Sequence, residues 1–384
     1  MIESDATSHA QPRTSLAMPY QYPVARRVKN SIVAVANDDR KSERVSAVPL
    51  TIPPRSGNRF ATKYPAGRMM TMRVCRKLRS RFAASALSLM LSAAALLGCL
   101  TGVDAAAPHQ ESIQIQGQRR TFTVYTPDDA GGTSLAILIV LHGGLGNGQY
   151  VARQTRLVNY VDRDKFVAVF PDGIRGHWND GRSTTSSGPD DVTFLRQMIT
   201  AVAQKWGGDP KRAFVAGISN GGMMALRMAC DASDVVTAIG VVVANMPADL
   251  VNRCQPSRPM PMVLFNGTSD PLMPWSGGSI AASPLLGTPG GEVVSAMDTF
   301  DFWAHLDGCG QPVVDSISGT DVKRHTASNC GSGSEVNLYE IEGGGHGWPG
   351  GIPPGPIESR FVGHVTSDIS ASAIIIQFFH RYGL

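Results

Sequence analysis

The chain has 384 residues, of which 42% are hydrophobic and 17% are charged, enough to bury the core of one large domain or two small ones. Its formal charge of +4 divides unevenly: residues 1–107 hold 16 basic and 6 acidic side chains, whereas residues 108–384 hold 19 and 25. Residues 108–384 are therefore acidic, which argues against a nucleic acid as partner.

The first 68 residues are polar, rich in Ser, Arg and Pro, and show no sustained hydrophobic period. This composition predicts disorder. Because a signal peptide follows them, we hypothesise that residues 1–68 are upstream sequence and that the biological start is Met69, Met70 or Met72.

Residues 69–107 have the three parts of a signal peptide. A basic stretch lies between Arg73 and Arg81, the run from Phe82 to Val103 is uncharged, and Ala105–Ala107 offers a small-residue cleavage site. Two alternatives stay open. Leu96–Cys99 resembles a lipoprotein box, in which a lipidated Cys99 would anchor the protein to a membrane, and the uncharged run is long enough for a membrane span. Each version places the body outside the cytoplasm, as a secreted or periplasmic protein.

The body begins with two segments of alternating polarity, 111–116 and 119–125, which predict a hairpin at a sheet edge. Strands and helices then alternate, which predicts a mostly parallel central sheet with helices on both faces. The expected strands are 135–141, 166–170, 213–216, 238–243, 261–265 and 335–341. The expected helices run from Asp190 or Asp191 to Trp206, from the end of the third of these strands to Cys230, and over 293–306 and 367–382. We expect residues 108–384 to form a single catalytic domain.

Four cysteines lie in this body, and in an exported chain they predict two disulfides with three possible pairings. We expect Cys230–Cys254 and Cys309–Cys330, because each pair closes a short local loop. The alternative is four free thiols in a cytosolic protein.

The segment Gly217–Gly221 connects a β-prone run to a helical pattern and carries Ser219 at its centre. A turn this tight brings backbones together, and a Cβ at either glycine would clash. Strand, sharp turn and helix are typical of a nucleophile elbow, in which the serine hydroxyl is lifted clear of the sheet. The alternative is an ordinary Ser-Gly turn.

A serine nucleophile needs a base, and the base needs an acid partner. Asp270 follows the strand 261–265 and is the expected acid, with Asp249 and Asp298 as weaker rivals. His346 follows the strand 335–341 in a glycine-rich loop and is the expected base. Its rival His142 is better explained as a partly buried residue that braces its own loop.

An oxyanion hole needs backbone N–H groups aimed at the developing charge. We expect Asn220 to supply one, and Gly144 or Leu145 in the loop after His142 to supply the other. That loop lacks the Gly-Lys-Ser/Thr ending of a phosphate-binding loop. No residues have metal-ligand spacing, so we expect no metal and no cofactor.

Aromatic residues near these motifs are candidates for substrate contact: Trp178 with Asn179, Trp275 and Trp348. A tryptophan could stack on a sugar or aryl ring, or pack on an aliphatic ester. The alternative for each is ordinary burial.

Together these motifs resemble the esterases related to poly(3-hydroxybutyrate) depolymerases and to secreted feruloyl and acetylxylan esterases. The matching pieces, in the family's order, are Leu141–Gly144, Trp178–Gly181, Asp190–Val192, Gly217–Met223, Gly267–Asp270 and Gly344–Pro349. The resemblance implies an α/β-hydrolase fold with Ser219 as nucleophile, Asp270 as acid and His346 as base. The better-known depolymerases often have a cysteine where Gly144 stands and an extra substrate-binding domain, and their absence here favours soluble oligomers or small esters.

We therefore expect a secreted, monomeric serine esterase acting on hydroxyalkanoate oligomers or related esters. The enzymatic alternative is a carbohydrate esterase that removes feruloyl or acetyl groups. The non-enzymatic alternative is a surface lipoprotein that binds glycans in the same cleft.

Overall fold

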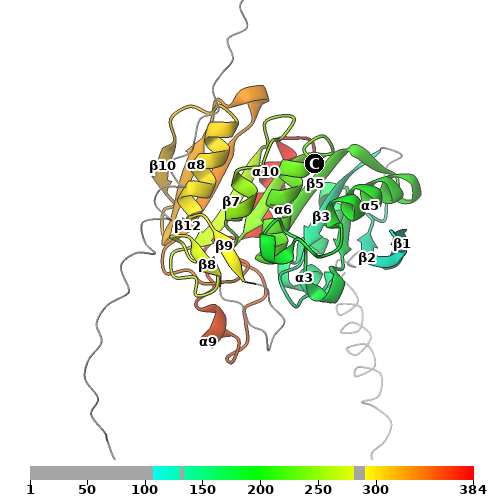
Figure 1. The fold of residues 1–384 in the computed structure, drawn as a ribbon, viewed down its shortest axis with the longest axis horizontal. Coiled ribbons are helices and arrows are strands. Elements are labelled where there is room, and N and C mark those ends of the chain that lie inside the picture. The colour runs from blue at the N-terminus through cyan, green and yellow to red at the C-terminus, as the bar shows by residue number, and fades with distance from the viewer. Residues whose placement is uncertain (1–106, 130–133, 281–289) are drawn as a thin grey trace, which may run out of the picture. The chain divides into compact units, whose positions relative to one another are not determined.

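The computed structural model describes residues 107–129, 134–280 and 290–384 (Figure 1). The predictions for residues 1–68 and for the signal peptide, including lipidation of Cys99, lie outside these ranges. Among the described residues, no helix is both long enough and apolar enough to cross a membrane.

A ten-stranded sheet carries the described part of the chain. In spatial order its strands are β1 (Pro108–Ile115), β2 (Gln118–Tyr125), β4 (Phe166–Pro171), β3 (Leu135–Leu141), β5 (Gly208–Ile218), β6 (Val236–Val242), β7 (Met262–Gly267), β12 (Val336–Ile341), β11 (Val322–Ala327) and β10 (Val313–Ser316). The six neighbours from β4 to β12 are parallel, and the strands outside them on both edges are antiparallel. A separate two-stranded sheet consists of β8 (Gly278–Ile280) and β9 (Gly291–Val293).

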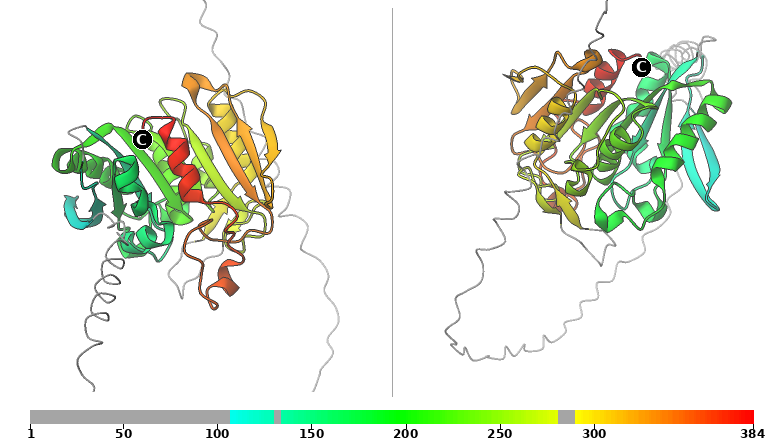
Figure 2. Two further views of the ribbon diagram at one scale, coloured as in Figure 1. Left: turned by 180° about the vertical axis from the view of Figure 1, so that it is seen from behind. Right: turned by 45° about the horizontal axis from the view of Figure 1, so that its top comes forward.

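Helices cover both faces of the sheet. One face carries α5 (Asp191–Trp206), α6 (Asn220–Asp231) and α8 (Ala296–Leu306), and the opposite face carries α3 (Gly148–Thr155) and α10 (Ala371–His380), as the front and back views show (Figures 1 and 2). The short helices are α4 (Val161–Asp164), α7 (Ala248–Val251) and α9 (Ser359–Val362). This architecture confirms the predicted α/β-hydrolase fold.

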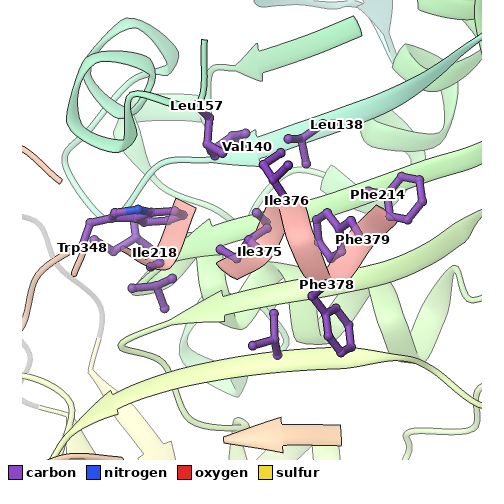
Figure 3. Packing of buried hydrophobic residues seen from close by; sticks show 14 of the residues in the cluster. Leu138, Val140, Leu157, Phe214, Ile218, Trp348, Ile375, Ile376, Phe378 and Phe379 are labelled. Carbon is purple, nitrogen blue, oxygen red and sulfur yellow. The ribbon is translucent and has the colours of Figure 1, made fainter. Parts of the chain in front are cut away.

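The central strands are apolar on both sides because both sides are covered. Every residue of β3 and β4 is buried, as their continuous apolar runs predict. On the face of α10, Ile375, Ile376 and Phe379 lie beside strand residues that include Leu138 and Phe214 (Figure 3). This packing fixes the central strands whose carboxyl ends carry the candidate site.

The predicted hairpin forms, with Gln116 and Gly117 at positive φ in its turn. Two predicted helices start too early. The helix predicted over 293–306 begins at Ala296, since Val293 pairs in β9 and Ser295 caps the helix. The helix predicted over 367–382 is α10, capped by Ser370 and ending at His380. The antiparallel pair β10–β11 was not predicted, because β10 is short and mostly exposed and β11 carries the polar run Lys323–Thr326 instead of an apolar run.

Candidate active site

Ser219 stands at the sharp turn between β5 and α6. Its backbone has φ 56° and ψ −121°, a conformation that costs a non-glycine residue about 1–3 kcal/mol. A Cβ on Gly217 would lie 2.2 Å from the carbonyl oxygen of Gly221, and a Cβ on Gly221 would lie 2.4 Å from the carbonyl oxygens of Leu141 and His142. The structure therefore has the nucleophile-elbow turn, and both of its glycines are sterically required.

Asp270 lies in the loop that follows β7. Its side chain is 1% exposed. One carboxylate oxygen, Oδ1, accepts hydrogen bonds from the backbone N–H groups of Leu272 and Met273, each at 2.8 Å. These two bonds fix the carboxylate plane and leave Oδ2 facing the histidine.

His346 lies in a glycine-rich loop after β12, against a second backbone segment, residues 362–365. A Cβ on Gly345 would lie 2.2 Å from the carbonyl oxygen of Val362, so only glycine permits this approach. The N–H of His346 donates to that same carbonyl at 2.5 Å. The glycines thus serve to lock the histidine's backbone in place.

The three side chains form one continuous hydrogen-bonded chain. Asp270 Oδ2 lies 2.8 Å from His346 Nδ1, and His346 Nε2 lies 2.9 Å from Ser219 Oγ. Because Asp270 must accept, Nδ1 carries the proton, and Nε2 is left to accept from the serine hydroxyl. The rival aspartates are engaged elsewhere: Asp249 accepts from the N–H of Ser183, and Asp298 accepts from the Ser295 hydroxyl.

The loop after His142 supplies one oxyanion candidate and excludes another. The N–H of Leu145 donates to the Gly176 carbonyl at 2.8 Å, so it is already engaged and the prediction for Leu145 is wrong. Gly144 is left, together with Asn220, whose N–H is the first of α6 and has no acceptor within the helix. Gly143, the neighbour of Gly144, packs against the Ser219 side chain, since a Cβ there would lie 3.5 Å from Ser219 Cβ.

His142 orients this loop. It is fully buried, and burial lowers its pKa, so the ring is neutral. Its Nδ1–H donates to the Gly143 carbonyl at 2.7 Å, and its Nε2 accepts from the N–H of Gly173 at 2.9 Å. Since the Gly143 carbonyl and the Gly144 N–H share one peptide plane, this bond also fixes the direction of the Gly144 N–H. The ring thus has the bracing role expected of it.

Two predicted substrate contacts are contradicted. Trp178 is 1% exposed, and its indole N–H donates to the His142 carbonyl at 2.9 Å, so the ring supports the loop from inside. Asn179 is buried and its side-chain amide donates to the Pro189 carbonyl at 3.1 Å. Neither side chain is available to a substrate at Ser219.

The other two tryptophans differ from each other. Trp348 is also 1% exposed, with its indole N–H donating to Ser372 Oγ at 2.9 Å, yet it borders a cavity beside His346. Trp275 is partly exposed just after Asp270, and its contact with substrate stays a prediction.

A buried ionic network behind the serine was missed in the sequence. Asp180 pairs with Arg182 at 2.7 Å, with side chains 0% and 3% exposed, and also accepts from the Asn220 side-chain amide at 2.6 Å. The Asn220 amide further bonds both backbone polar groups of Trp178. The network ties the loop 177–182 to the start of α6. Its residues lie far apart in the chain, and the only sequence signal was the Asp-Gly-Arg run that follows Trp178.

A cavity of about 250 Å³ opens beside His346. Its walls come from α3 and from the segment 347–365, which lies between β12 and α10 in the chain. Its polar residues include Tyr150, Arg153, Gln154 and Glu358, and its apolar residues include Ile352, Pro353, Pro354, Val362 and Val365. Of these lining residues, only His346 and Trp348 were predicted from the sequence to lie at the site.

Both disulfides are present in the predicted pairing, Cys230–Cys254 and Cys309–Cys330. The first joins the end of α6, which begins at the serine, to the loop before β7. The second joins the end of α8 to the loop before β12.

Comparison with known proteins supports the resemblance seen in the motifs. Residues 120–252 match the family described as esterase, PHB depolymerase. Feruloyl esterase B of Piromyces equi is 29% identical over 234 residues, which are 59% of this chain and 42% of that protein. The putative esterase NocK of Nocardia uniformis subsp. tsuyamanensis is 27% identical over 282 residues, 69% of this chain and 80% of that protein.

Among solved structures, an acetyl xylan esterase from Aspergillus awamori aligns with a TM-score of 0.46 and 15% identity, covering 66% of this chain and 98% of that one.

The chain spans under half the length of the Piromyces relative and most of NocK. The sequence matches confirm the resemblance to the esterases related to PHB depolymerases and to feruloyl and acetylxylan esterases.

Proposed function

We propose that this chain is an exported serine esterase that hydrolyses carboxylic esters through Ser219, His346 and Asp270. One observation carries the proposal. Three polar side chains from three separate loops form a hydrogen-bonded chain that ends at a serine on a strained turn. Such strain persists only where the surrounding structure holds it, and it is typical of reactive residues.

The proposed reaction has two halves. Ser219 Oγ attacks the ester carbonyl carbon while His346 Nε2 takes its proton, and Asp270 stabilises the imidazolium. The tetrahedral intermediate collapses as His346 returns the proton to the leaving alcohol oxygen. Water then attacks the acyl-serine by the same route, releasing the carboxylic acid and free Ser219.

Charge on the carbonyl oxygen would be held by the N–H groups of Asn220 and Gly144. Both are backbone donors in rigid surroundings: one starts a helix, and the other is aimed by His142. Donors fixed before the reaction stabilise the oxyanion without reorganising.

For substrate, we propose hydroxyalkanoate oligomers or related small esters. The family match over residues 120–252 and the largely aliphatic cavity beside His346 support this choice. A carbohydrate esterase is the second candidate, because feruloyl esterase B of Piromyces equi is among the relatives. Hydrolysis of methyl ferulate without hydrolysis of hydroxybutyrate oligomers would select the second candidate.

A fluorophosphonate probe tests the mechanism. We expect labelling of the purified protein at Ser219, mapped by peptide mass spectrometry, and loss of labelling after heating. Ser219→Ala should remove labelling and lower turnover by on the order of 10⁶. No labelling of folded protein would refute the proposal and favour a non-catalytic glycan-binding protein.

Export is also part of the proposal and is supported by the two disulfides, which form in oxidising compartments. N-terminal sequencing of the native protein tests it. A mature protein that begins between residues 100 and 108 supports cleavage of the leader. A peptide from residues 1–68 in mature material would contradict it.

A further inference from the structure

The cavity beside His346 has a defined place in the reaction. During acylation His346 Nε2 delivers its proton to the leaving alcohol oxygen, so the alcohol part of the ester must lie next to this ring. The cavity includes His346 in its wall. We infer that it holds the alcohol part of the ester, an inference that rests on the proposed function.

The residues that line the cavity indicate which kind of alcohol would fit it. Most of the wall is aliphatic, from Ile352 and Pro353 to Val362 and Val365, which suits a short methyl-bearing chain. The polar side chains are Tyr150, Arg153 and Gln154 on α3 and Glu358 at the N-cap of α9. Tyr150 Oη donates to Glu358 Oε1 at 3.4 Å, so these two satisfy each other.

Arg153 is the cation of this wall. Its side chain is exposed to solvent and takes part in no hydrogen bond or ion pair found in the described part of the chain, although Glu358 borders the same cavity. Arginine presents a planar fork of donors that matches a carboxylate. An unpaired guanidinium at the edge of an aliphatic cavity fits a chain that ends in a carboxylate.

We propose that Arg153 recognises the free carboxylate of a hydroxy acid that forms the alcohol part of the ester. The substrate would then be an oligomer engaged by its carboxyl end. Hydrolysis breaks the last ester bond, leaves the shortened acyl chain on Ser219, and releases a hydroxy acid whose new hydroxyl takes its proton from His346. Water then frees the acyl chain as a carboxylic acid.

A matched substrate pair tests the proposal: the linear dimer of 3-hydroxybutyrate with a free carboxylate, and the methyl ester of the same dimer. Both contain the same internal ester bond and differ by one charge. For the wild type, we expect kcat/KM for that bond to be higher with the free acid, and the advantage to shrink as salt is added.

Arg153→Gln should lower kcat/KM for the free acid by about tenfold, the size expected when one charge-assisted hydrogen bond is lost, and leave the methyl ester within about twofold. Arg153→Lys should keep part of the preference. Arg156→Gln is the matched control. Like Arg153, Arg156 is exposed and belongs to the same helix end, but it does not border the cavity.

The outcomes separate the two proposals. If the wild type hydrolyses neither compound and no other ester, the proposed function fails. If it hydrolyses esters but Arg153→Gln changes the two dimers equally, or changes neither, the assignment of Arg153 is overturned. The assignment would also be overturned if Arg156→Gln removes the preference for the free acid as fully as Arg153→Gln does. The preference would then reflect long-range charge alone.

Discussion

Asp307, at the end of α8, is a buried carboxyl group that makes the stability of the fold depend on pH. It is 3% exposed. Its Oδ2 accepts from the N–H of Met260 at 2.9 Å and from Ser334 Oγ at 2.6 Å, whereas its Oδ1 is buried without a partner. Burial raises its pKa from 3.8 to about 6, an effect that these two hydrogen bonds and the nearby charge of Arg258 only partly oppose.

The sign follows from which state holds the proton more tightly. Because the folded pKa is above the unfolded one, the folded state retains the proton between pH 3.8 and about 6 where the unfolded state loses it. Stability from this group is therefore greatest at low pH, falls through that window and is constant above it. At 1.36 kcal/mol for each pKa unit, the loss amounts to about 2–3 kcal/mol by neutral pH.

Asp307→Asn removes the titration while keeping the shape. The amide oxygen can accept from Met260 and Ser334, and the amide group places donors where the unpartnered Oδ1 lay. We expect the variant to be less stable than, or equal to, the wild type near pH 4, and to gain about 2–3 kcal/mol relative to it by pH 7.5.

The measurement is urea unfolding of both proteins at a series of pH values, with the disulfides intact and tryptophan fluorescence as the signal. The exposed Asp321→Asn serves as control and should shift little with pH. The linkage requires the difference in free energy of unfolding between wild type and variant to change with pH. If that difference stays constant within about 0.5 kcal/mol from pH 4 to 7.5, the reasoning is refuted.

Three further predictions concern the site and its frame. Asp270→Asn should lower kcat by about 10⁴ while the folded structure is kept, measured by steady-state kinetics on a nitrophenyl ester; a loss under tenfold would contradict its role. Trp178→Phe should lower the free energy of unfolding by about 1–3 kcal/mol, because the buried His142 carbonyl loses a donor, and should change KM little. A large change in KM with unchanged stability would restore Trp178 as a substrate contact. Replacing Cys309 and Cys330 together by serine should cost about 2–5 kcal/mol in chemical unfolding, and an unchanged midpoint would show that this disulfide is dispensable.

Features that depend on neighbours in the chain could be predicted. The turn around Ser219 needs glycine at positions 217 and 221, and that requirement is visible in five consecutive residues. The strands β3 and β4 are continuous apolar runs because both of their faces are covered. The order of serine, aspartate and histidine, each after a strand, was likewise enough to select Asp270 and His346, because parallel strands bring their carboxyl ends to one edge.

Features that depend on distant contacts could not be predicted. Trp178 and a substrate-lining tryptophan look alike in sequence, and only the packing of its ring against His142 shows that it is buried. Nothing in the sequence separates Gly144 from Leu145 as an oxyanion donor. Only the folded structure shows that the Leu145 N–H is engaged by the Gly176 carbonyl. The helix starts at Ala296 and Ala371 were also missed, since pairing in β9 and serine capping override hydrophobic periodicity.

The sequence by itself predicted the turn at Ser219, the alternation of strands and helices, the disulfide pairing and the three side chains that form the hydrogen-bonded chain Asp270–His346–Ser219. Each of these follows from local backbone geometry or short loops. The tertiary structure alone decided the cavity beside His346, the position of Arg153 in its wall and the raised pKa of Asp307. Burial and unpaired charge arise from segments far apart in the chain, so they exist only once those segments have packed together.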